Sequence, residues 1–292
     1  MKPTTAAALF VKLRDDPDDF QWRMGVRPLE LGEWILIDSG YEDDLAEVDR
    51  LLRARREEIV LSEPGSRPAA LEVYEAIAGH IAALDADKFG EVAPTTGDEH
   101  PLEAARVLVQ EDLGVLERRP NGWVLTATAI AAPTAWNVPS KLGLNLDEIH
   151  APVPRYDIDL SDRMNKFFDR MTVDRPVWRS NWTVTDDQSL RLDVPVRTAP
   201  MDPTIDISNV GERTWLRVEY QTLRRMPDSD AILFTIRIIR QELASVAEEP
   251  EALAELVRRL RQIPADVAEY KHSSVLYVDL IEAWASANGR LS

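Results

Sequence analysis

The chain has 292 residues, of which 45% are hydrophobic, so it can bury a sizeable core without crosslinks. It contains no cysteine, which excludes disulfides, zinc–thiolate sites and iron–sulfur clusters held by this chain. Its 34 basic and 51 acidic residues give a formal net charge of -17, which opposes nucleic-acid backbones and argues against a nucleic-acid partner.

The first residues carry no long apolar segment. The stretch Ala6 to Phe10 is too short for the core of a signal peptide or for a membrane span, so we expect a cytoplasmic protein without a membrane partner. No linker rich in Gly, Ser or Pro and no repeat of twenty to fifty residues divides the sequence. We therefore expect a single domain over residues 1–292.

Helical spacing of apolar residues predicts several amphipathic helices, each with one buried face. The predicted faces are Leu45, Val48, Leu51 and Leu52; Leu71, Tyr74, Ala78 and Ile81; Met164, Phe167, Phe168 and Met171; and Leu253, Leu256, Val257 and Leu260. Pro250 stands where a first helical residue would, and Pro264 restarts the pattern. The C-terminal region is therefore expected to be helical.

Two hairpins are predicted as well. Asn121-Gly122 lies between two short β-prone segments, which is typical of a tight turn. Residues 214–225 and 231–239 alternate β-branched or aromatic residues with polar ones around the turn residues 227–230. Strands and helices together predict a mixed α+β fold.

The segment from Asn145 to Pro154 has the most constrained local shape. Asn145 and Glu148 resemble a capping box at the start of a short helix. Pro152 is expected to force its predecessor out of the helical region, so that the helix stops near His150 and a stiff extended segment follows. An imidazole held in this way suits a metal ligand, although a lone histidine before a proline is more often a structural or capping residue.

Five blocks in order, residues 24–29, 109–113, 148–154, 175–182 and 215–225, resemble the haem-dependent oxidative N-demethylase α-subunit family. The resemblance covers about residues 20–285. It implies a PAS-like antiparallel sheet core with flanking N- and C-terminal helices, a bound haem b, and oxidation of a small amine by dioxygen. Electrons would come from a separate flavin and iron–sulfur reductase subunit.

The resemblance also implies roles for single residues. His150 would be the iron ligand, and the Arg-Arg pair falls on Arg224 and Arg225. Strand alternation places these two arginines on opposite faces, so only one should face the haem. We expect this to be Arg224, as the catalytic residue that polarises dioxygen, because its face is largely apolar; Arg225 is kept as a cofactor-binding candidate. Both would otherwise be ordinary surface charges.

Further candidates for the haem pocket are Trp178, Asn181 and Trp182 as walls, with Lys141 and Arg179 at the propionates. Tryptophans near a strand are more often core residues, and a solvated face would explain the two cations equally well.

The sequence departs from the family pattern at two positions, where Tyr220 and Ala135 stand in place of expected arginines. Both departures put the substrate in doubt, and they raise the question whether haem is retained.

Two other functions are compatible with the same residues: a haem-based gas sensor or carrier, and a haem-free regulatory homologue. The sequence has no Gly-rich dinucleotide fingerprint after a strand, so NADPH oxidation would belong to the separate reductase. Turnover of an amine would distinguish the enzyme from the sensor, and the absorption spectrum would identify a haem-free protein.

Overall fold

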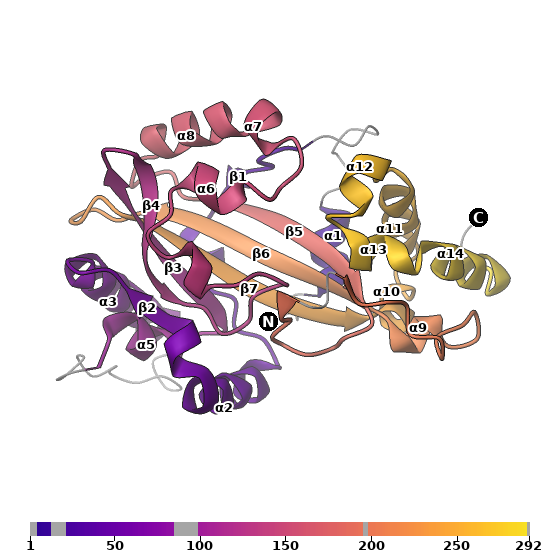
Figure 1. The fold of residues 1–292 in the computed structure, drawn as a ribbon. Helices are drawn as coiled ribbons and strands as arrows, with labels where there is room; N and C mark the ends of the chain where they lie inside the picture. The colour runs from indigo at the N-terminus through magenta and orange to yellow at the C-terminus, as the bar shows by residue number, and fades with distance from the viewer. Residues whose placement is uncertain (1–4, 13–21, 85–98, 195–197, 291–292) are drawn as a thin grey trace.

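A computed structural model describes residues 5–12, 22–84, 99–194 and 198–290. Its centre is a seven-stranded sheet with the order β1-β5-β6-β7-β3-β4-β2, in which every neighbouring pair is antiparallel (Figure 1). The predicted mixed α+β class is confirmed. The PAS-like arrangement stays an expectation from the resemblance.

Strands and helices are interspersed along the chain. The strands are β1 (Arg27–Pro28), β2 (Val60–Ser62), β3 (Glu111–Arg119), β4 (Gly122–Ala129), β5 (Val177–Thr185), β6 (Trp215–Arg225) and β7 (Ile232–Glu242). The α-helices are α1 (Ala6–Val11), α2 (Tyr41–Ile59), α3 (Arg67–Leu84), α5 (Pro101–Arg106), α6 (Leu146–His150), α7 (Tyr156–Asp159), α8 (Ser161–Arg170), α9 (Val210–Arg213), α10 (Leu243–Val246), α11 (Pro250–Arg261), α12 (Ala265–Ala268), α13 (His272–Leu276) and α14 (Val278–Ala287). Short 3-10 turns are η1 (Leu31–Glu33) and η2 (Pro139–Lys141).

Both predicted hairpins are confirmed. In β3–β4 the two connecting residues are Pro120 and Asn121, and Gly122 opens β4 with a φ of 123°, a conformation that a residue with a Cβ rarely adopts. In β6–β7 the strands pair from Trp215 opposite Glu242 to Arg225 opposite Ile232, so they form the longest ladder of the sheet.

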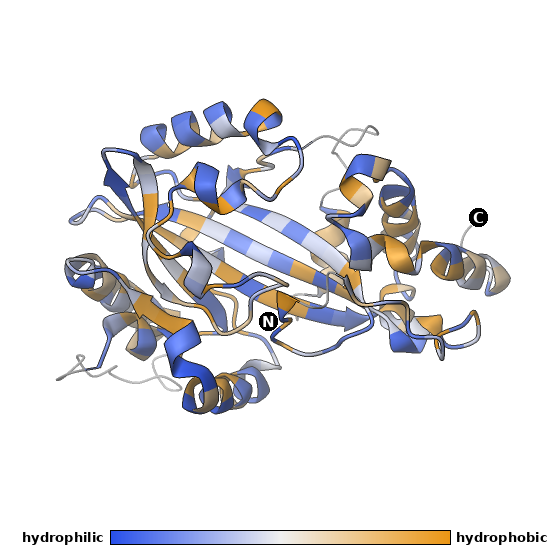
Figure 2. Cartoon of the chain, in the orientation of Figure 1, coloured by the Kyte–Doolittle hydropathy of each residue, from blue (hydrophilic) through white to orange (hydrophobic). Residues whose placement is uncertain are grey.

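Alternation along β6 separates the sheet into two faces. The odd-numbered residues belong to what we call the α6 face, where Leu223 packs with Leu146 of α6, Tyr156 of α7 and Phe168 of α8. The even-numbered residues belong to what we call the α3 face, where Val218 and Tyr220 share a core with α1, α3, α5, α11 and α14. Figure 2 shows hydrophilic and hydrophobic bands mixed along these central strands.

Most of the predicted helical faces are buried. Val48, Leu51 and Leu52 of α2 pack with Ile236 and Ile238 of β7 in a separate small core. The face predicted for α3 is correct at Tyr74, Ala78 and Ile81, whereas Leu71 is wrong because 39% of its surface is exposed. The four residues predicted on α11 are buried in the α3-face core.

No helix in the described part of the chain is both long enough and apolar enough to cross a membrane.

Candidate functional site

His150 ends the short helix α6, and the capping box predicted for this helix is present. The Asn145 side chain accepts hydrogen bonds from the backbone N–H groups of Asp147 and Glu148, both at 3.0 Å. In return, the Asn145 N–H donates to the Glu148 carboxylate at 2.8 Å. These bonds fix the start of a five-residue helix and thereby the position of its last residue.

The backbone after His150 differs from the prediction. Ala151 keeps a helical conformation (φ -49°, ψ -33°) despite the following Pro152, and no extended segment follows. Instead, the Val153 N–H donates to the His150 carbonyl at 2.8 Å, and Arg155 adopts a left-handed conformation that starts α7. The preference of a residue before proline for extended backbone is here outweighed by a turn that leads directly into α7.

The imidazole of His150 is held at two points. Its Nδ1 lies 2.7 Å from the Leu146 carbonyl oxygen, and its ring stacks on the Tyr156 ring with centroids 4.9 Å apart and planes 11° from parallel. A carbonyl oxygen can only accept, so Nδ1 carries the proton and Nε2 keeps its lone pair. Within the part of the chain that the structure describes, no hydrogen bond engages Nε2.

Two cations and burial favour the neutral form of this imidazole. Burial is the main cause that lowers the pKa of His150, and the charges of Arg179 and Lys141 lower the pKa further. Lys141 lies close because its Nζ donates to the carbonyl of Ile149 at 3.1 Å. A neutral imidazole with a free Nε2 is the form that ligates a metal.

Arg179 reaches the α6 face from β5, where it pairs with Gln221 of β6. Burial lowers the pKa of the Arg179 guanidinium, and the neighbouring Glu219 carboxylate opposes this effect. Arg179 Nε is shielded from solvent and has no hydrogen-bond partner among the described residues. This cation therefore has unused hydrogen-bonding capacity on the face that carries His150.

A small polar network lies next to Arg179. Glu219 Oε2 accepts a hydrogen bond from Gln221 Nε2 at 2.7 Å and one from Asn181 Nδ2 at 3.4 Å. The predicted pocket residue Asn181 is thus on the α6 face, where it orients Glu219. Strand alternation predicts Glu219 and Gln221 on one face, but neither residue is predicted to have a role. The sequence feature that could have indicated a polar site here is the presence of polar residues at alternate positions of a buried strand.

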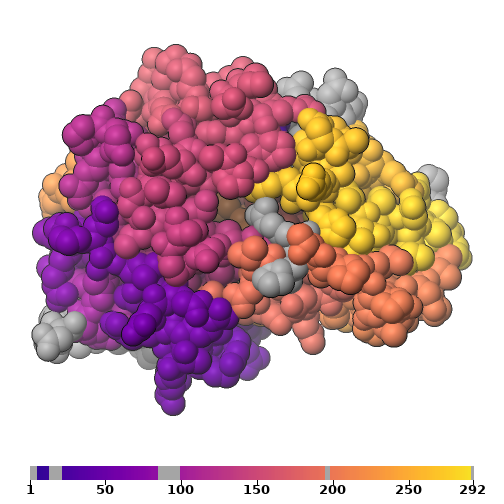
Figure 3. All heavy atoms as spheres, viewed as in Figure 1, coloured from indigo at the N-terminus to yellow at the C-terminus, as the bar shows by residue number. Residues whose placement is uncertain are grey.

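His150 and Arg179 are each half-buried, and burial is the main cause of the pKa shift of each side chain. Figure 3 shows the surface hollowed between the magenta segment that contains α6 and the yellow C-terminal helices.

Arg224 and Trp178 lie on the other side of the sheet. Arg224 alternates with Leu223 and pairs with Leu233 of the α3-face core, and Trp178 packs against Tyr220 with ring centroids 5.3 Å apart. The structure therefore does not bring either residue to His150. Arg224 is separated from His150 because it lies on the α3 face of the sheet. Its predicted part in oxygen activation stays a prediction.

Arg225 and Trp182 are occupied elsewhere. Arg225 is on the α6 face, as strand alternation predicted, but it forms a two-point ion pair with Asp230 at 2.6 Å and donates to the Met171 carbonyl at 3.0 Å. Trp182 packs edge-on against Phe10 in the α3-face core. Both side chains are thus engaged in contacts that do not involve His150.

The two departures from the family pattern have different surroundings. The Tyr220 hydroxyl is on the α3 face and donates to the Glu33 carbonyl at 3.1 Å. Ala135 is buried with a φ of 55°, in a loop held by the buried Arg217, whose Nε donates to Thr134 at 2.9 Å. Tyr220 therefore removes no charge from the α6 face.

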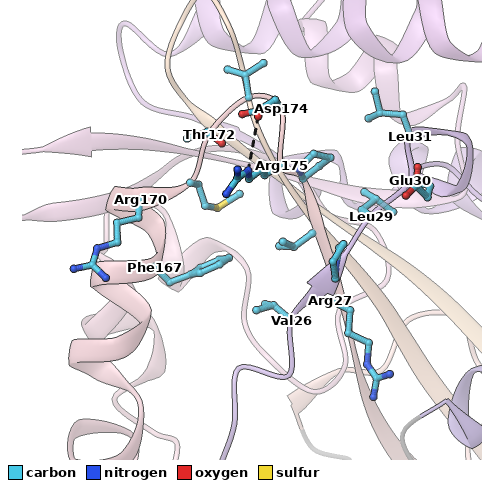
Figure 4. A pocket seen from close by; sticks show the side chains of 15 residues that line it. Val26, Arg27, Leu29, Glu30, Leu31, Phe167, Arg170, Thr172, Asp174 and Arg175 are labelled. Atoms are coloured by element: carbon cyan, nitrogen blue, oxygen red, sulfur yellow. Dashed lines mark ion pairs between the residues drawn. The ribbon is translucent and has the colours of Figure 1, made fainter.

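A separate cavity of about 720 Å³ opens between β1 and the connection from α8 to β5. Figure 4 shows Phe167 and Val26 at this cavity, with Arg170, Arg175 and Arg27 around it. Phe167 and Val177 line the cavity and also pack against the core that contains Leu146 of α6, so the cavity borders the α6 face. His150 itself is not among the residues that line it.

Among the described residues, no group of three or more His, Asp or Glu side chains is arranged to hold a metal ion. The site described above consists instead of a single histidine with a free Nε2, two nearby cations and the Glu219 network.

The family comparison agrees with the resemblance seen in the sequence. Residues 25–279 match the model of the family described as haem-dependent oxidative N-demethylase, alpha subunit-like. This range includes α6, β5 and β6 and so the whole of the His150 site. The chain belongs to the haem-dependent oxidative N-demethylase, alpha subunit-like family.

Proposed function

We propose that this chain binds haem b on the α6 face through His150 and acts as an oxidative N-demethylase of a small amine. The observation that carries the proposal is the state of the His150 ring: Nδ1 is engaged by the Leu146 carbonyl at 2.7 Å, which leaves Nε2 as the free donor atom. A second hydrogen bond of this kind is what orients histidine ligands in metal sites. The PAS-like fold relationship is part of the same proposal.

The side chains around His150 fit a haem with its two carboxylates. Arg179 has a shielded Nε without a partner among the described residues, and Lys141 is close enough to affect the pKa of His150. Both would hold negatively charged groups by charge-assisted hydrogen bonds, in keeping with the expectation that they meet the propionates. Asn181 holds Glu219 from the side, so that this carboxylate keeps a fixed direction on the same face.

A bound haem would supply the redox chemistry, the binding and reductive activation of dioxygen, that the protein side chains lack. The chain contributes a fixed imidazole and excludes water around it by packing α6, α7 and α8 over the sheet. Oxidation of the carbon beside the amine nitrogen gives a carbinolamine, which collapses to the demethylated amine and formaldehyde.

Electrons for this reaction would come from another protein. The chain has no cysteine to hold an iron–sulfur cluster, and its family is named for an alpha subunit. A separate reductase with a flavin and an iron–sulfur cluster fits both facts.

The test is to reconstitute the purified chain with haem and to compare His150→Ala with His272→Ala. His272, the first residue of α13, is the matched control because its Nε2 already lies 3.1 Å from the Ala199 carbonyl oxygen. We expect the intense haem absorption band and its shift on reduction to be lost in His150→Ala and kept in His272→Ala. A spectrum that is the same in both variants would sink the proposal.

Turnover is measured separately, with dimethylamine, NADPH and a surrogate reductase. Formaldehyde production by the haem-loaded chain supports the enzyme, whereas ligand binding to the haem without formaldehyde would identify a sensor or carrier.

A further inference from the structure

Three side chains contact one another on the α3 face, on the side of the sheet that does not carry His150. They are Trp34, just after η1, His80 of α3 and Arg224 of β6, and we call them the Arg224 cluster. The Arg224 guanidinium lies 4.4 Å from the centre of the Trp34 ring, and the Trp34 and His80 ring centres are 5.0 Å apart. The cluster joins three segments that are distant in the sequence.

Each member of the cluster has a shielded nitrogen without a hydrogen bond to any described residue. These atoms are Trp34 Nε1, His80 Nε2 and Arg224 Nε. Buried polar groups in folded proteins are almost always hydrogen-bonded, because an unpartnered donor loses its water and gains nothing in return. Three such atoms on side chains in mutual contact therefore indicate that a further group completes their hydrogen bonds.

The charge of Arg224 is also unbalanced. In the described ranges of the chain Arg224 forms no ion pair, whereas its neighbour Arg225 is paired with Asp230 at 2.6 Å. The acidic residue that acts on Arg224 is Glu72, and both oxygens of Glu72 already accept backbone N–H groups, of Asp228 and Ser229, at 2.8 Å. The described residues thus leave the charge of Arg224 without a carboxylate partner.

We propose that the Arg224 cluster binds the carboxylate of a small organic acid. The planar fork of a guanidinium matches the two oxygens of a carboxylate, and the imidazole and the indole add uncharged N–H donors beside it. Trp34 is fully buried in the α3-face core, whereas Arg224 and His80 are half-buried and provide the surface that the acid can reach. One positive charge without an ion pair suits a monoanion.

The neutral state of His80 agrees with this proposal. Burial, followed by the charge of Arg224, lowers the pKa of His80, so this ring would act as an N–H donor and not as a second cation. Its tautomer would be set by the ligand.

This site is independent of the proposed haem site, because the sheet lies between Arg224 and His150. A carboxylate bound by Arg224 would be neither the amine substrate nor a haem propionate held by Arg179. The inference therefore does not rest on the proposed function, and the His150→Ala variant should still bind the acid.

The experiment titrates the full chain, as purified, with benzoate and follows the heat of binding and the indole N–H signals of the eight tryptophans by NMR. Chloride at equal ionic strength controls for screening, and inorganic phosphate tests whether the site prefers another oxyanion. The variants are Arg224→Gln, Trp34→Phe and, as the matched loss of one positive charge, Arg175→Gln. Arg175 is exposed, and its ion pair with Asp174 is long, at 3.8 Å.

We expect benzoate to bind saturably and to shift the indole N–H signal of Trp34. This signal is identified as the one that is missing from the spectrum of Trp34→Phe. Binding should weaken by about tenfold or more in Arg224→Gln and by less in Trp34→Phe, because loss of the charged donor costs more than loss of a neutral one. Arg175→Gln and His150→Ala should bind like the parent. Absence of saturable binding, equal binding by Arg224→Gln, or a preference for phosphate over benzoate would overturn the proposal.

If Arg224→Gln fails to fold, the result for Trp34→Phe decides. This variant keeps an aromatic side chain but removes the N–H together with the five-membered ring of the indole, so unchanged affinity would count against the site.

Discussion

Glu111 is a fully buried carboxyl group whose two oxygens have different surroundings. Oε1 accepts the Leu36 backbone N–H at 2.9 Å, whereas Oε2 has no partner among the described residues. Burial raises the pKa of Glu111 from its ordinary value of 4.5 to about 7, although the charge of Arg237 acts in the opposite direction. At the scale of a single residue, this carboxyl links stability to pH.

The sign of this linkage follows from proton binding. Between pH 4.5 and about 7 the folded chain keeps a proton on Glu111 that the unfolded chain has released. The stabilisation is fully present below pH 4.5 and is lost as the pH rises through 7. The free energy of unfolding should therefore fall between pH 5 and pH 8 in the parent and fall less in Glu111→Gln. The two falls should differ by up to about 3 kcal/mol.

Urea unfolding at the two pH values measures this difference. Glu75→Gln, at an exposed position of α3, is the control and should behave like the parent. Equal pH dependence in Glu111→Gln and the parent would show that Glu111 does not titrate in this range.

What the sequence reveals about single residues depends on how local the cause is. The capping box of α6 and the end of this helix at His150 follow from residues within ten positions, and both predictions are confirmed. The choice between Arg224 and Arg225 depended on which sheet face receives α6. Which face receives α6 is decided by tertiary packing and cannot be read from local sequence. Arg224 was favoured because its face of the strand is the more apolar one. His150 instead lies over the face that carries Arg179 and Glu219.

At the scale of elements, Asp147 joins the three helices over the α6 face. Its carboxylate accepts hydrogen bonds from the Tyr156 hydroxyl at 3.0 Å, from Ser161 Oγ at 2.7 Å and from Asn165 Nδ2 at 3.0 Å. Tyr156 in turn stacks on His150. The orientation of the imidazole is thus coupled to the packing of α7 and α8.

This coupling predicts different effects for two substitutions of Tyr156. Tyr156→Phe keeps the stacked ring and removes one hydrogen bond, so it should lower the free energy of unfolding by about 1–2 kcal/mol and leave haem binding intact. Tyr156→Ala leaves a cavity beside His150 and should cost about 3–5 kcal/mol and weaken haem binding. Urea unfolding and haem titration measure both effects. Similar haem affinity in the two variants would contradict a positioning role of the ring.

The elements themselves were largely predictable. The hairpin strands and the amphipathic helices follow from periodicities of two and 3.6 residues. The turn after His150 was not, because Pro152 disfavours helical backbone at Ala151 while Val153 and Arg155 complete a turn that brings Tyr156 back to the ring. Short strands such as β1 and β2 have too few residues to show a period.

At the scale of the whole molecule, close contacts between distant segments hold the C-terminal helices to the rest. Gly211 of α9 approaches Trp284 of α14 so closely that an added Cβ would lie 2.3 Å from Trp284 Cζ2. Across the α6 face, Arg155 forms a two-point ion pair with Asp266 of α12, both bonds at 2.6 Å. This exposed pair contributes little by itself, and the glycine contact is the stricter constraint.

Gly211→Ala should therefore destabilise the protein. The Trp284 ring is rigid and nearly buried, so it must shift to admit the methyl group, at a cost of about 1–3 kcal/mol. Gly79→Ala is the matched control, because Gly79 is also helical and nothing lies within 4 Å of its added Cβ. It should stabilise by about 0.4–1 kcal/mol through the unfolded state. Thermal unfolding of both variants checks the opposite signs.

The pairing of strands that are distant in the sequence could not be predicted from the sequence. The pairing of β3 with β7 brings Glu111 opposite Arg237 across more than a hundred residues, and β5 pairs with β6 across the segment between residues 185 and 215. Local periodicity carries no information on such partners, because any strand with a suitable face could occupy the same position.

The alternation of β6 has a consequence for how this protein can be altered. Adjacent positions of the strand, such as Arg224 and Arg225, belong to compartments with separate surroundings, one under α3 and one under α8. Residues two positions apart on β6 lie on the same face of the sheet, whereas consecutive residues lie on opposite faces. Chemical change at even numbers and at odd numbers of this strand can thus be made, and read out, independently.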